Sequence, residues 1–252
     1  MNNTKITVDN FNLHIGDNHI LKNINCKIPE KKITVILGSS GCGKTTLLKS
    51  MNRLTDLYND VSIDGEIKLN GKNIYSNEIE VNDLRRKMGL LLQHPSPLPM
   101  SIFNNVAYGL RISRRRKKQF LQLRVEHYLK QANLWNEVST RLKDPASRLS
   151  IGQQQRLCLA RGLAVDPELI LADEPTSALD PLSSQAIEQK ILELKKHFTI
   201  VVVTHTLRQA KRIADYVIFM YLGEIIEQGN AQEIFENPQH KLLKTFLNGS
   251  LN

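Results

Sequence analysis

Residues 33–50 read ITVILGSSGCGKTTLLKS and place three kinds of sequence side by side. The run 33–37 is apolar and rich in β-branched residues, which is typical of a buried strand. A glycine-rich turn follows at once, and the residues from Thr45 onward have the composition of a helix. The stretch therefore predicts a strand, a tight loop and a helix in direct succession.

The loop in this stretch, residues 38–45, matches the pattern G-x-x-x-x-G-K-[ST] in the strand-to-helix context of a phosphate-binding loop. Glycines let backbone N–H groups point into one turn, and the following helix adds its positive end. We expect Lys44 to reach the β- and γ-phosphates of a nucleotide and the Thr45 hydroxyl to bind Mg²⁺. The alternative, a flexible loop with a chance Lys-Thr pair, is disfavoured by the context. The expected cofactor ligands are Gly38, Ser39, Ser40, Gly41, Cys42, Gly43, Lys44, Thr45 and Thr46.

Two more predicted strands end in polar residues. Residues 169–172 are followed by Asp173 and Glu174, and residues 199–203 lead to His205. Ligands of open α/β sheets bind at the carboxyl ends of strands. We therefore expect Asp173 to hold Mg²⁺, Glu174 to orient the attacking water, and His205 to sense the γ-phosphate. The alternatives are an acid that only caps a helix and a histidine with a structural role.

The rest of the chain predicts the fold class. Residues 6–13 and 63–70 have the pattern of hairpin-type strands. From about residue 94 to 162 helical patterns replace strand patterns, whereas strands and helices alternate further on. We predict an α/β protein: a P-loop NTPase (RecA-like) core over about 1–93 and 163–252, with an N-terminal antiparallel β subdomain and an inserted α-helical subdomain over about 94–162.

The composition argues against disordered, membrane-spanning, secreted and disulfide-rich classes of protein. Of the 252 residues, 41% are hydrophobic and 23% are charged, as in ordinary globular proteins. Apolar runs are far shorter than the roughly 20 residues of a membrane-spanning helix, and no signal peptide is recognisable, so we expect a cytoplasmic protein. Three scattered cysteines predict neither disulfides nor a zinc site. The formal charge of +9 leaves nucleic acid as a minor alternative, although the basic run 114–118 favours a solvated helix face.

Further motifs make the chain resemble the ATPases of the ABC transporter family over essentially its whole length. Gln93 matches the family's Q-loop, LSIGQ at 149–153 resembles the signature LSGGQ, SALD at 177–180 is similar to the D-loop, and residues 204–205 are similar to the H-switch. The resemblance implies that Gln93 contacts Mg²⁺ and couples to membrane subunits. The implied catalytic residues are Glu174, His205, Lys44 and Gln93; the implied metal ligands are Thr45, Gln93 and Asp173; the further nucleotide ligands are Ser150, Gly152, Gln153 and Asp180.

The resemblance also implies cofactors and partners. We expect ATP and Mg²⁺ to be held between two head-to-tail copies, because the signature can reach a phosphate only if another surface presents one. The implied partners are two transmembrane permease subunits at the cytoplasmic face of the membrane and, indirectly, a solute-binding protein, without nucleic acid. Residues 51–75, 94–112 and 153–181 are most similar to ATPases of phosphate importers. An importer of another oxyanion, a non-transport ABC ATPase and a regulatory module without turnover are the alternatives.

Some positions depart from the family pattern. Ile151 replaces the first glycine of the signature, and we expect hydrolysis to survive if its φ is negative. His14 and Ile15 stand where phosphate-importer ATPases usually have tyrosines, so adenine should be held less firmly, with Phe11 and His14 as candidate stacking residues. Residues 94–112, whose prolines predict a stiff turn, are the expected docking surface for the permease.

Overall fold

A computed structural model describes residues 3–113 and 117–249. The basic run 114–118 lies mostly outside the described residues, so its expected role as a helix face stays a prediction. The chain divides into two compact units, one formed by Met1–Arg85 and Leu194–Asn252 and the other by Arg86–Glu193. The predicted subdomain boundaries near residues 94 and 162 also remain a prediction.

The first unit opens with an antiparallel sheet of four strands in the order β2, β1, β4 and β5. β1 (Thr4–Ile15) pairs with β2 (Asn18–Pro29) through a turn at Gly16 and with β4 (Val61–Leu69) on its other side. The short β5 (Lys72–Asn73) extends β4. Alternation along β1 buries its apolar side chains, namely Ile6, Val8, Phe11 and Leu13. The predicted antiparallel sheet is thus confirmed.

The first unit also contains a mainly parallel sheet. β3 (Ile33–Gly38) has β8 (Thr199–Thr204) and β9 (Tyr216–Tyr221) as parallel neighbours, and β10 (Glu224–Asn230) runs antiparallel to β9. Every residue of β3 and β8 is buried. Continuous β-branched runs of this kind are typical of parallel strands that are covered on both faces.

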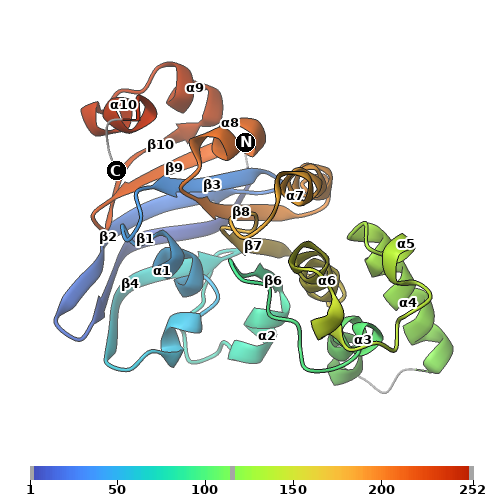
Figure 1. Cartoon of the computed structure of the whole chain (residues 1–252). Helices are drawn as coiled ribbons and strands as arrows, with labels where there is room; N and C mark the ends of the chain where they lie inside the picture. The colour runs from blue at the N-terminus through green and yellow to red at the C-terminus, as the bar shows by residue number, and fades with distance from the viewer. Residues whose placement is uncertain (1–2, 114–116, 250–252) are drawn as a thin grey trace. The chain divides into compact units, whose positions relative to one another are not determined.

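Helices cover this parallel sheet. α1 (Lys44–Ser50) and α8 (Leu207–Ile213) both pack against β3 and β8, and they lie on opposite sides of these strands in Figure 1. α1 also contacts β2 of the antiparallel sheet. The remaining helical segments of this unit are η1 (Leu54–Leu57), α2 (Val81–Arg86), α9 (Ala231–Glu236) and α10 (Lys241–Leu247).

The second unit is mostly helical and contains one parallel strand pair, β6 (Met88–Leu91) with β7 (Leu169–Asp173). α6 (Ile151–Leu163) packs against β6 and against α3 (Ile102–Ser113) and α4 (Lys118–Gln131). The other helical segments are α5 (Trp135–Val138), η2 (Ala146–Arg148) and α7 (Pro181–Leu194). Among residues 3–113 and 117–249, no helix has the length and apolar character to cross a membrane.

Candidate nucleotide site

The loop between β3 and α1 is shaped by glycines, two of which, Gly38 and Gly43, leave no room for a side chain. A Cβ atom on Gly38 would lie 2.2 Å from the carbonyl oxygen of Met220 in β9. Gly43 stands at the N-cap of α1 with a φ of 100°, a conformation that L side chains rarely adopt. The loop therefore holds its tight turn by close backbone approach.

Lys44 folds over this loop. Its Nζ donates hydrogen bonds to the carbonyl oxygens of Gly38 at 2.9 Å and Ser39 at 2.6 Å, and the residue is only 5% exposed. Both acceptors are neutral, so the loop does not cancel the positive charge of the ammonium group. A buried cation held in this way is suited to charge-assisted hydrogen bonds with phosphate oxygens.

Cys42 lies inside the same loop but is not a reactive thiol. Burial raises the pKa of its thiol above the ordinary value, and the positive charge of Lys44 only partly offsets this effect. The thiolate, which is the reactive form, is therefore scarce at neutral pH. The part of the chain that the structure describes holds all three cysteines as buried free thiols.

His205 is positioned by the strand next to this loop. β8 runs parallel to β3, with Thr204 opposite Leu37, so the two strands end at the same edge of the sheet. His205 is exposed directly after β8, and the backbone N–H of Thr206 donates to Thr204 Oγ1 at 3.0 Å. The first unit thus brings the phosphate-binding loop and the predicted γ-phosphate sensor to one edge, as the sequence suggested.

The second unit brings three other predicted residues together. β6 and β7 run parallel with Leu91 opposite Ala172, so Gln93 emerges beside the acids that end β7. Gln93 Nε2 lies 3.4 Å from Glu174 Oε2 and donates to it. Asp173 is only 6% exposed.

Glu174 has a φ of 44°, in the left-handed region that glycine favours. A non-glycine residue in such a conformation stores on the order of 1–3 kcal/mol, and such strain concentrates at functional sites. Lys31 and Leu222, to which no role in the chemistry is assigned, share this conformation, so the backbone of Glu174 does not by itself assign the residue to the chemistry.

The signature stretch forms the start of α6. Ser150 is the N-cap, and its Oγ accepts from the backbone N–H of Gln153 at 3.3 Å, while Gln153 Oε1 accepts from the backbone N–H of Ser150 at 3.0 Å. This reciprocal capping box leaves the Ser150 hydroxyl proton free to be donated. Ile151 is helical and is 53% exposed. Its φ is not positive, so its backbone meets the condition under which hydrolysis is expected to survive this substitution.

Gly152 lets the starts of α6 and α7 approach closely, and Asp180 caps α7. A Cβ atom on Gly152 would lie 2.6 Å from Ser183 Oγ in α7, so this glycine of the signature permits close helix contact. Asp180 caps α7, because its Oδ1 accepts from the backbone N–H groups of Leu182 and Ser183 at 3.0 Å. Hydrogen bonds from Ser183 lower the pKa of Asp180.

The residues that were candidates for stacking on adenine have other partners. Phe11 is fully buried and stacks on Tyr75 with ring centroids 5.9 Å apart. His14 stacks on His19, its partner across the hairpin, at 3.9 Å. Side chains alternate along a strand, so Ile15 faces away from this histidine pair. The expectation that Phe11 could stack on the base is wrong, because it has no exposed surface.

Gln155 is a polar residue whose environment the sequence did not reveal. It is 1% exposed, and its Nε2 donates to the carbonyl oxygens of Leu92 at 3.0 Å and Pro175 at 3.1 Å. Leu92 directly precedes Gln93, and Pro175 directly follows Glu174. In the sequence, only the run of glutamines at 153–155 draws attention to this position. The run does not show which of the glutamines faces the interior.

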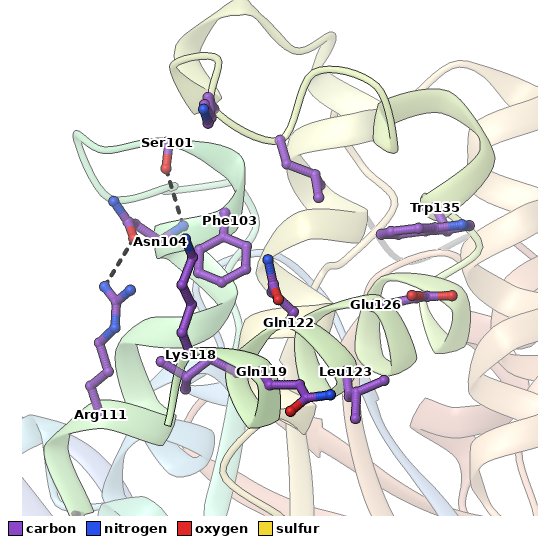
Figure 2. Close-up of a pocket in the computed structure, with 13 residues that line it drawn as sticks. Ser101, Phe103, Asn104, Arg111, Lys118, Gln119, Gln122, Leu123, Glu126 and Trp135 are labelled. Carbon is purple, nitrogen blue, oxygen red and sulfur yellow. Dashed lines mark hydrogen bonds between the residues drawn. The ribbon is translucent and has the colours of Figure 1, made fainter. Parts of the chain in front are cut away.

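A groove of about 910 Å³ opens in the same unit between α3, α4, α5 and residues 142–143. In Figure 2 the ring of Phe103 points toward α4, and Trp135 lies at the far end. Arg111, Lys118 and Lys143 line it as cations. Its one acid, Glu126, is paired with Lys130 at 2.6 Å. The groove therefore combines apolar side chains with a net positive charge.

The loop that leads into this groove is held by Asn105, which sequence reasoning missed. Asn105 is fully buried; its Nδ2 donates to the carbonyls of Leu98 at 3.1 Å and Ser101 at 3.1 Å, and its Oδ1 accepts from the Leu98 N–H at 2.8 Å. An asparagine in a helical stretch carries no sequence signal for this role. The proline-rich loop is thus held by this buried amide together with Arg161, which donates to the Ser96 carbonyl at 3.0 Å.

Comparison with known proteins agrees with this geometry. The family model described as ABC transporter matches residues 21–177. A protein of Thermotoga maritima named phosphate import ATP-binding protein PstB is 48% identical over 246 residues, covering 98% of both chains. Its namesake in Thermococcus kodakarensis is 47% identical and covers 99% of both. The solved structure of cbiO1 from Clostridium perfringens, described as part of the ABC transporter complex cbiONQ, is 31% identical, with a TM-score of 0.80 and coverage of 93% of this chain and 91% of that one.

Proposed function

The chain belongs to the ABC transporter family, and we propose that it is the ATP-hydrolysing subunit of a phosphate importer. The observation that carries this proposal is 47–48% identity to phosphate import ATP-binding proteins over 98–99% of the chain. The alternative within the family is an importer of another oxyanion, because an ATPase subunit does not itself contact the transported solute.

The phosphate-binding loop would hold the nucleotide. Backbone N–H groups of residues 38–46 and the ammonium of Lys44 would donate to the phosphates, and binding would redirect Lys44 from its two loop carbonyls. These contacts would be made to phosphates, which ATP and GTP share, so the loop would not discriminate between them. Ile15 would offer the base an apolar contact without an aromatic face.

The acids after β7 would carry the chemistry. We propose that Thr45, Asp173 and Gln93 would hold Mg²⁺, because a hydroxyl, a carboxylate and an amide oxygen are all hard oxygen ligands. The ion, when bound, would neutralise charge on the phosphates. Glu174 would accept a hydrogen bond from the attacking water, and the Gln93 amide, 3.4 Å away, would hold that carboxylate in place. His205 would donate to the γ-phosphate.

A second copy of the chain would complete the site. The start of α6 offers the Ser150 hydroxyl and the N-terminal end of a 13-residue helix, both suited to phosphate. We propose that Ser150, Gly152 and Gln153 meet the γ-phosphate of ATP held by the other copy, with Asp180 close by. Loss of that phosphate would release the two copies.

The groove beside residues 94–112 would receive the permease. Its apolar side chains and its cations fit an acidic amphipathic helix. Two permease subunits would place the ATPase dimer at the cytoplasmic face of the membrane as a peripheral component. A solute-binding protein would act on the permease and reach the ATPase only through it, and nucleic acid has no part in this scheme.

The decisive experiment uses two variants in gel filtration with Mg-ATP. Glu174→Gln keeps the shape of the side chain but not its charge, so it should bind ATP and elute as a dimer. Lys44→Ala should lose about 10- to 100-fold in ATP affinity, since charge-assisted hydrogen bonds contribute about 1.5–3 kcal/mol. A Glu174→Gln variant that binds ATP but stays monomeric would contradict the shared site.

The transported solute is tested with the permease and binding protein reconstituted in vesicles. Phosphate should stimulate hydrolysis, whereas stimulation by sulfate or molybdate alone would favour another oxyanion. In the same vesicles, Lys118→Glu with Lys143→Glu should reduce uptake while basal hydrolysis persists. Lys72→Glu, on the exposed end of β5, is the matched control. Normal uptake by the double variant would remove the groove from the interface.

A further inference from the structure

Gln155 joins two segments that are distant in the chain. Its Nε2 donates to Leu92, 63 residues earlier, and to Pro175, 20 residues later. Its Oε1 is buried and has no hydrogen-bond partner among the described residues. The orientation of the amide is therefore defined, because a flipped amide would set Oε1 against two carbonyl oxygens.

The two acceptors flank the residues proposed to act on water. Leu92 precedes Gln93 and Pro175 follows Glu174; these two residues, called the hydrolytic pair below, have their side chains 3.4 Å apart. One buried amide thus fixes the backbone on both sides of the pair. A shift of Gln155 would change the separation of Gln93 and Glu174 directly.

Gln155 also belongs to the first turns of α6, which Ser150 begins. The capping box between Ser150 and Gln153 holds this end of the helix together. Arg156, the next residue, pairs with Glu137, which also accepts from Gln153 Nε2 at 2.8 Å. The start of α6 is therefore a stiff segment, and a displacement of Ser150 must carry Gln155 with it.

We propose that Gln155 is a positioning residue that couples the signature to the hydrolytic pair of its own subunit. When phosphate engages Ser150, the resulting shift of α6 reaches Gln93 and Glu174 through the two hydrogen bonds of Gln155. Hydrolysis by one copy then depends on ATP bound to the other. This inference rests on the proposed function, since it takes the signature as a ligand of ATP.

The first test replaces Gln155 by Met, which has a similar shape but no donor. ATP affinity should stay within about twofold and the KM for ATP should not change, whereas kcat should fall about 10- to 100-fold, because small displacements of catalytic groups have effects of that size. Gln154→Met is the matched control. The Gln154 amide donates to Leu149 at 2.9 Å, within its own turn, so its kcat should change less than about threefold.

A double-mutant cycle with Ser150→Ala separates coupling from simple stabilisation. Ser150→Ala should lower kcat in the wild-type and Gln154→Met backgrounds but should have little further effect in Gln155→Met. Multiplicative effects of Ser150→Ala and Gln155→Met would overturn the proposal. Gln155→Asn, which keeps the amide but is too short to reach both carbonyls, should behave like Gln155→Met.

Two controls distinguish failure of the proposed function from failure of the proposed role of Gln155. If wild-type protein neither hydrolyses ATP nor forms the Glu174→Gln dimer, the proposed function is wrong. If it does both and Gln155→Met retains the wild-type kcat, only the role of Gln155 is wrong. Thermal unfolding and ATP binding monitor the fold, and loss of the fold in both the Met and Asn variants would assign Gln155 to stability and overturn the coupling.

Discussion

The phosphate-binding loop and the signature both carry glycines in their family patterns, yet only one of them has kept every glycine in this chain. In the loop, Gly38 faces a backbone oxygen at a distance that excludes a Cβ atom. In the signature, Ile151 occupies the first glycine position in a helical conformation and is half exposed. A glycine is therefore indispensable where backbones touch, is favoured where φ is positive, and is replaceable at a helical position that opens to solvent.

The largest effect is expected at the loop. Gly38→Ala should destabilise the protein by about 3 kcal/mol, since the clashing atoms of Met220 are backbone and cannot rotate away. Gly41→Ala, where no atom lies within 4 Å, should cost only the left-handed strain of about 1–2 kcal/mol. Urea unfolding of both variants measures the difference. Equal losses would show that the clash is relieved by movement of β9.

An intermediate effect is expected at the second glycine of the signature. Gly152→Ala should destabilise by about 1–3 kcal/mol, because the new Cβ would meet Ser183 Oγ at 2.6 Å. This contact is with a side chain, so Ser183→Ala should recover more than half of the loss. Urea unfolding of the single and double variants completes the cycle. No recovery would mean that the backbone of α7, and not Ser183, sets the limit.

The smallest effect is expected at Ile151. Ile151→Gly should lower stability by at most about 1 kcal/mol, the ordinary penalty for glycine in a helix. Steady-state hydrolysis should change less than tenfold. Ile151→Ala, which removes the side chain without freeing the backbone, separates the two contributions. A rise in rate above tenfold in the Gly variant would show that the native signature is impaired, and the comparison between loop and signature would then need revision.

The sequence predicted much of the candidate site because its elements are local. A strand, a glycine turn and a helix follow one another within residues 33–50, and the acids directly follow β7. The pairing of β6 with β7, which the sequence did not predict, brings Gln93 beside Glu174. The nucleotide and metal ligands themselves remain predictions.

Residues whose role depends on distant partners were missed. Gln154 and Gln155 are the same type of residue and are adjacent, but only Gln155 faces the interior and donates to two carbonyls that are distant in the sequence. Asn105 holds a loop that precedes it. Phe11 was a candidate to stack on adenine because it is aromatic and lies close to Gly16 in the sequence. Its burial excludes that role. In each case the sequence shows the type of side chain but not the groups that surround it in the fold.

The sequence by itself determined the family, the alternation of strands and helices in the α/β core, and the glycine-rich loop between β3 and α1, because these depend on residues that are consecutive in the chain. Only the tertiary structure decided which glycines are indispensable, that Ser150 and Gln153 cap one another, and that Gln155 fixes the backbone on both sides of Gln93 and Glu174. The physical reason is that steric exclusion and buried hydrogen bonds are properties of pairs of atoms, and folding chooses partners that are far apart in sequence.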